Sequence, residues 1–77
     1  MTDRVDREVD ARGLKCPLPV LRAAKALREM RAGDLLRVLA DDPMAMIDLP
    51  HHCAQAGHEH LGRTDGPDHQ THLIRRG

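Results

Sequence analysis

The chain contains no aromatic residue, and its positive and negative charges balance. None of the 77 residues is Phe, Tyr or Trp, and 12 basic side chains are matched by 12 acidic ones. Without aromatic rings, a protein lacks the surfaces on which single-strand binders stack bases. Without net positive charge, it lacks the attraction that drives non-specific binding to polyanions. We therefore expect no direct binding of nucleic acid.

Cysteines and long apolar runs are also scarce. The two cysteines, Cys16 and Cys53, are too few for a disulfide-stapled secreted scaffold and lack the paired spacing of a zinc ribbon. No stretch approaches the ~20 apolar residues of a membrane span, and the first 20 residues contain no apolar run. These features predict a cytoplasmic protein that does not associate with membranes. The length suits one core, so we expect a single domain over residues 1–77, monomeric when free.

What the chain does contain is an alternation of strand-like and helix-like segments. A period of two over residues 5–9 predicts a short edge strand, and the nearly continuous aliphatic run over 35–40 predicts a central strand. Residues 59–63 and 69–75 flank a turn-rich connector and predict a terminal hairpin.

Proline and glycine mark the first of two predicted helices. Pro17 and Pro19 suit a first helical turn, so this helix begins just after Cys16 and runs to about Arg31, where Ala32–Gly33 ends it. The expected buried stripe consists of Val20, Leu21, Ala24, Leu27 and Met30.

The second predicted helix begins with Asp42 as the N-cap and Pro43 at the first helical position. It runs to about Ala56, and Gly57 closes it. Pro50 falls inside this segment and should kink or split the helix. The order β-α-β-α-β-β then predicts a two-layer α/β sandwich: a four-stranded mixed sheet whose first two strands are parallel, with both helices on one face.

Cys16 has the features of a reactive cysteine. It precedes a helix whose N-terminal partial positive charge favours a thiolate. Residues 12–31 hold six basic side chains and one acid, Glu29, a local net charge of +5. Pro17 and Pro19 remove two N–H donors but stiffen the chain around the thiol. We predict a thiol pKa below the ordinary value. The simpler interpretation is a cysteine that only caps the helix or serves as a small apolar residue.

The segment around Cys16 resembles a known family. Its sequence, Asp10-Ala11-Arg12-Gly13-Leu14-Lys15-Cys16-Pro17-Leu18-Pro19, is similar to the Asp-Ala-x-Gly-x-x-Cys-Pro-x-Pro signature of the TusA-like (SirA-like) sulfur-carrier proteins. The resemblance spans nearly the whole chain and extends through Asp41-Asp42-Pro43, Asp48-Leu49-Pro50, Cys53, Gly57-His58-Glu59 and Leu73-Ile74-Arg75-Arg76.

The resemblance implies a persulfide carrier without a cofactor. Cys16 would accept sulfane sulfur from a donor such as a cysteine desulfurase and pass it to an acceptor protein, with Asp10, Gly13, Pro17 and Pro19 supporting the motif. In this family such relays serve 2-thiolation of tRNA, molybdenum-cofactor supply, sulfur oxidation or selenium metabolism. Leu18 stands where the tRNA-thiolating member carries an acid. This difference bears on the partner, and the loss of a nearby negative charge favours a lower thiol pKa.

Basic side chains around the thiol are candidates for partner docking. The alternative is an ordinary solvated helix face, but a carrier must present its thiol to several proteins. The docking candidates are Arg12, Lys15, Arg22, Lys25 and Arg28.

Cys53 and the six histidines offer weaker signals. The two thiols should lie on the order of 15 Å apart along parallel helices, beyond the roughly 7 Å between Cα atoms that a disulfide needs, so we interpret Cys53 as a packed helix residue. A metal site from His58, His60 and either His52 or Cys53 is conceivable, but the spacing is not diagnostic and we expect no metal. A non-catalytic interaction module and a small metal-binding protein remain the alternatives to a carrier.

Overall fold

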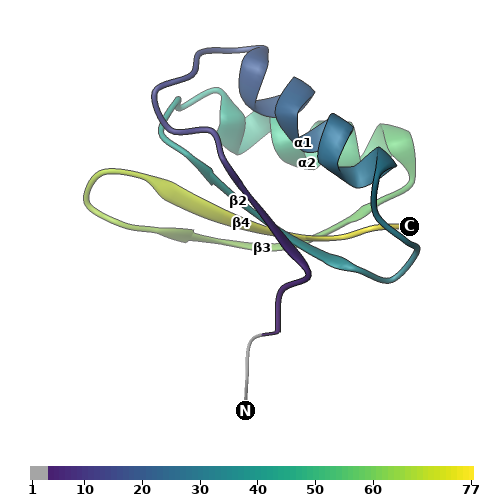
Figure 1. Cartoon of the computed structure of the whole chain (residues 1–77). Helices are drawn as coiled ribbons and strands as arrows, with labels where there is room; N and C mark the ends of the chain where they lie inside the picture. The colour runs from purple at the N-terminus through teal and green to yellow at the C-terminus, as the bar shows by residue number, and fades with distance from the viewer. Residues whose placement is uncertain (1–3) are drawn as a thin grey trace.

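The computed structural model describes residues 4–77, which form two helices packed on one face of a four-stranded sheet (Figure 1). The elements are β1 (Arg7–Asp10), α1 (Leu18–Arg28), β2 (Leu35–Ala40), α2 (Ala45–Ala56), β3 (Glu59–Asp65) and β4 (Gln70–Arg75). The strands lie in the order β1-β2-β4-β3; β1 and β2 are parallel, and β4 is antiparallel to both of its neighbours. The predicted two-layer sandwich is confirmed, with β1 at an edge and β2 inside the sheet.

The core lies between the sheet and the helices. Leu36 and Val38 of β2 are fully buried, as is Ile74, which pairs with Leu36 from β4. They form one cluster with Leu27 of α1 and Leu49 of α2. The alternate residues of β2 are only partly buried, because both helices lie on the opposite face of the sheet.

The strands differ from the prediction at their ends. β1 spans 7–10 and not 5–9, because its ladder follows the partners that β2 offers, from Leu36 to Leu39. β3 continues to Asp65 and β4 begins at Gln70, so the connecting turn is shorter than predicted. The Gly66 N–H donates to the His69 carbonyl at 2.8 Å and closes this turn.

α1 ends three residues earlier than predicted, at Arg28 and not Arg31. The Glu29 N–H donates to the Ala26 carbonyl at 3.0 Å, so the last turn tightens to the i→i−3 pattern that is common at helix ends.

The buried face of α1 also differs from the predicted stripe. Leu21 is 56% exposed and Ala24 is only partly buried. Leu27 is buried as predicted, but the helix also packs through the small side chains of Ala23 and Ala26, which the stripe did not include. The buried positions are Pro19, Ala23, Ala26 and Leu27, with Val20 and Met30 partly buried beside them.

α2 begins later than predicted and is not divided. Its first helical residue is Ala45. The predicted N-cap, Asp42, accepts the Met44 N–H at 3.1 Å just before the helix begins. Pro50 lies inside one helix, so the predicted split does not occur. Gly57 ends the helix as expected, with a φ of 83° that suits glycine.

Candidate functional site

Cys16 lies on the surface at the end of the loop that joins β1 to α1. Its thiol is free and exposed. Because α1 and α2 each follow one of two parallel strands, both helices begin at the same end of the sheet (Figure 1). The start of α2 is therefore the neighbour of the Cys16 loop.

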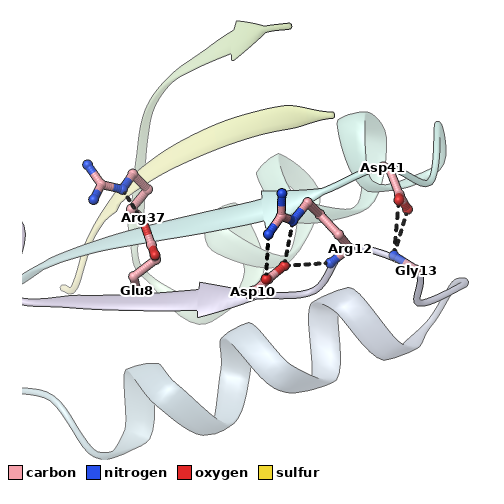
Figure 2. Close-up of polar contacts among 6 residues, drawn as sticks. All are labelled: Glu8, Asp10, Arg12, Gly13, Arg37 and Asp41. Atoms are coloured by element: carbon pink, nitrogen blue, oxygen red, sulfur yellow. Dashed lines mark hydrogen bonds and ion pairs between the residues drawn. The ribbon is translucent and has the colours of Figure 1, made fainter. Parts of the chain in front are cut away.

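The first half of this loop is held by the motif residues. The Asp10 carboxylate accepts two hydrogen bonds from the Arg12 guanidinium, at 2.9 and 2.8 Å, and one from the Arg12 N–H (Figure 2). The Arg12 side chain holds the pKa of Asp10 down to about 2. Gly13 has a φ of 83°, and its N–H donates to both carboxylate oxygens of Asp41 at 3.0 Å (Figure 2).

Asp42 fixes the backbone beneath the thiol. One carboxylate oxygen accepts the Cys16 N–H at 2.6 Å, and the other accepts the Met44 N–H. The Asp42 side chain thus ties the cysteine to the start of α2, and these two backbone donors lower the pKa of its carboxyl. Pro17 follows Cys16 through a cis peptide bond, and Pro19 is buried inside the first turn of α1.

The Cys16 thiol has an acidic neighbour. Its S–H donates to Asp48 Oδ2, with 3.1 Å between sulfur and oxygen. This hydrogen bond raises the pKa of Cys16, and desolvation and the negative charges of Asp48 and Asp42 raise it further. The expectation of a lowered pKa is therefore wrong for this conformation.

The charges around the thiol are set by contacts between elements and not by proximity along the chain. Three of the basic residues near Cys16 in sequence, Arg22, Lys25 and Arg28, lie along α1. The carboxylates that act on the thiol come instead from Asp42, just before α2, and Asp48, in its first turn. Asp41, Asp42 and Asp48 all lie in segments that carry the family resemblance. That resemblance is the signal in the sequence that could have identified them as site residues.

The predicted docking residues fall into two groups. Arg12 is engaged by Asp10 (Figure 2). Within residues 4–77, the other four form no ion pair and are exposed: Lys15, Arg22, Lys25 and Arg28.

Cys53 differs from Cys16 in accessibility. It is 1% exposed and belongs to the core cluster that includes Leu49. Burial raises the pKa of its thiol to about 11. The prediction of a packed helix residue is confirmed, and the two thiols have opposite environments.

Two histidines form a polar contact that the sequence did not reveal. His72 is fully buried, and its Nδ1 lies 2.9 Å from His60 Nε2. Its Nε2 contacts Gln70 Oε1, and the Gln70 side-chain amide donates to the Asp42 carbonyl at 2.9 Å. Because a glutamine Oε1 only accepts, His72 must carry its proton on Nε2 and accept from His60 on Nδ1.

The positions of the histidines bear on the metal site that the sequence suggested. Within residues 4–77, no three His, Cys, Asp or Glu side chains are grouped so that they could hold a metal ion. In the same part of the chain, neither helix has the length and apolar composition to cross a membrane.

Fold and site together define a class: small two-layer α/β proteins that present one free thiol at the start of a helix. The family model described as sulfurtransferase TusA matches residues 7–76. The sulfur carrier protein TusA of Pseudomonas entomophila (strain L48) is 42% identical over 77 residues, which cover 99% of this chain and 96% of that protein. The crystal structure of the SirA-like protein from Desulfitobacterium hafniense superposes with a TM-score of 0.82 at 30% identity, covering 92% of this chain and 97% of that one. The chain belongs to the TusA family of sulfur carriers.

Proposed function

We propose that this carrier holds sulfane sulfur as a persulfide on Cys16, takes it from a donor protein such as a cysteine desulfurase, and passes it to an acceptor protein. The observation that carries the proposal is the contrast between the two thiols. Cys16 is exposed within a Cys-Pro-x-Pro motif, and Cys53 is buried in the core. Only an exposed sulfur can meet a sulfur on another protein.

The transfer is an exchange that needs no oxidant. The Cys16 sulfur attacks the terminal sulfur of the donor's persulfide; a new S–S bond forms at Cys16, and the donor's own S–S bond breaks. The proton from the Cys16 thiol goes to the departing donor thiolate. An acceptor thiol then attacks the terminal sulfur on Cys16 in the same way, and the Cys16 thiol is restored.

The hydrogen bond from Cys16 Sγ to Asp48 can form in the empty carrier but not in the loaded one. In the empty state the thiol donates to Asp48, and the raised pKa keeps it in the less nucleophilic S–H form. Loading requires the partner to displace this hydrogen bond. Once loaded, Sγ carries no proton and cannot donate to Asp48. The bond from Asp42 involves the Cys16 backbone, so it is retained in both states.

The test is sulfur loading followed by mass spectrometry. Incubation with a cysteine desulfurase and cysteine should add about 32 Da, one sulfur atom, to Cys16, and reductant should remove it. Cys53→Ser serves as the matched control and should load normally. Cys16→Ser should not load, yet it should stay folded because an exposed position at a helix start tolerates serine.

Two results would contradict the proposal. One is a wild-type chain that gains no sulfur from a desulfurase or from glutathione persulfide. The other is Cys16→Ser loading as well as wild type. Either would favour the alternative of a non-catalytic interaction module with the same fold.

A further inference from the structure

Exposed apolar side chains gather around the thiol. Within residues 4–77, five large apolar side chains are exposed, and four of them lie at the starts of the two helices. Leu18 and Leu21 belong to α1, Met44 precedes α2, and Ile47 is in its first turn. Their exposed fractions run from 46% to 64%. The fifth, Leu61, lies on β3.

These four residues, which we name the apolar collar, are tied to Cys16 by short structural links. Leu18 is two residues beyond Cys16, and the Leu21 N–H donates to the carbonyl of the adjacent Pro17 at 3.1 Å. On the other helix, Ile47 precedes Asp48, whose carboxylate receives the thiol. The Met44 N–H binds the same Asp42 carboxylate as the Cys16 N–H. The collar therefore borders the thiol from both helices.

We propose that the apolar collar is the docking surface for the protein that delivers sulfur to Cys16. This inference rests on the proposed function. The donor's terminal sulfur must come within bonding distance of Cys16 Sγ, so any protein donor must cover the surface that borders this thiol. An exposed apolar patch is typical of a surface that a partner covers.

The charges beside the collar define the chemistry of the partner. On the α1 side, Lys15, Arg22 and Lys25 are exposed and form no ion pair within residues 4–77. α2 contains no Lys or Arg, and its one acid is Asp48. The complementary surface is therefore an apolar patch around the donor's reactive cysteine, with an acidic edge that faces α1.

The experiment compares two sulfur sources in matched variants. Leu21→Gln and Ile47→Gln place an uncharged polar group in the collar and add no carboxylate beside the thiol, and Leu61→Gln makes the same change at the exposed apolar residue outside it. Loading is measured with a cysteine desulfurase plus cysteine, and separately with glutathione persulfide, which needs no docking surface. Thermal unfolding by far-UV circular dichroism checks that each variant is folded.

The two collar variants should load about tenfold or more slowly from the desulfurase, the usual effect of disrupting a central interface residue. They should load at the wild-type rate from glutathione persulfide, because the charge around the thiol is unchanged, and Leu61→Gln should match wild type with both sources. Loading by the desulfurase should also slow as salt is added, because the charges of α1 are screened.

The outcomes separate this inference from the proposed function. The docking surface is refuted if collar variants and wild type load equally from the desulfurase. It is also refuted if wild type loads no faster from the desulfurase than from an equal concentration of glutathione persulfide. A wild-type dimer that Leu21→Gln dissociates would also refute it, because the collar would then join two copies of the chain. Failure of wild type to load from either source refutes the proposed function itself.

Discussion

The burial of His72 predicts a loss of stability in mildly acidic solution. Its imidazole is fully buried, and this burial, followed by the charges of His60 and Arg63, lowers its pKa to about 4. In the unfolded chain a histidine titrates at about 6.5. Between these two values the unfolded chain binds the proton and the folded chain does not, so acid favours unfolding. The stability associated with neutral His72 is complete above pH 6.5 and declines as the pH falls towards 4.

The size of this effect follows from the two pKa values. Lowering the pH from 7.5 to 5 removes about 2 kcal/mol of stability through His72, by the linkage relation. For a chain of this size, that loss lowers the melting temperature by about 10 °C. Solvent screening reduces this free energy only slightly, because the exposed fraction of His72 is 0%.

The variant that isolates this effect is His72→Gln. A glutamine can still donate an N–H to Gln70, but it cannot take up a proton in this range. Its melting temperature should therefore fall less than that of wild type between pH 7.5 and 5, by about 10 °C. His51→Gln, at an exposed position on α2, is the matched control and should behave as wild type. Far-UV circular dichroism follows the unfolding, since the chain has no tryptophan.

The refuting result is a pH dependence that is the same in His72→Gln and wild type. A direct measurement gives a second test: the ring protons of His72 in an NMR titration should show a midpoint well below that of an ordinary histidine. A midpoint near 6.5 would refute the assumption that the folded chain keeps this ring neutral.

Two further predictions concern the thiol and the core. Asp48→Asn removes the carboxylate that raises the pKa of Cys16, so alkylation of Cys16 at pH 7 should become faster relative to buried Cys53; an unchanged rate would mean that Asp48 does not control the thiol. Leu49→Ala removes a fully buried side chain and should destabilise the fold by about 2–5 kcal/mol in urea unfolding, whereas exposed Ile47→Ala should cost about 0.5 kcal/mol or less.

The sequence was most informative where local pattern determines structure. The aliphatic run over 35–40 predicted β2 to the residue, and Gly57 marked the end of α2. Burial on α1 was predicted less well, because apolar spacing did not show that Ala23 and Ala26 would be buried while Leu21 stays exposed.

The environment of the thiol was harder to predict for a related reason. Spacing along a chain predicts neighbours within one element. Asp48 on α2 contacts Cys16 before α1, although the two residues are far apart in sequence. The contact between His60 and His72 likewise depends on the register of β3 against β4. Both features required the packing of elements in three dimensions.

The loop that carries the thiol is anchored by Asp42 more firmly than an ordinary surface loop. This one residue accepts hydrogen bonds from Cys16 before α1, from Met44 before α2 and from Gln70 on β4. Moving the Cys16 backbone away from Asp42 therefore perturbs a residue that also contacts the start of α2 and β4, so we expect this loop to open less readily than a loop without such contacts. The Cys16 sulfur is open to solvent, while the Cys16 amide is bound to a buried residue that links three elements of the fold.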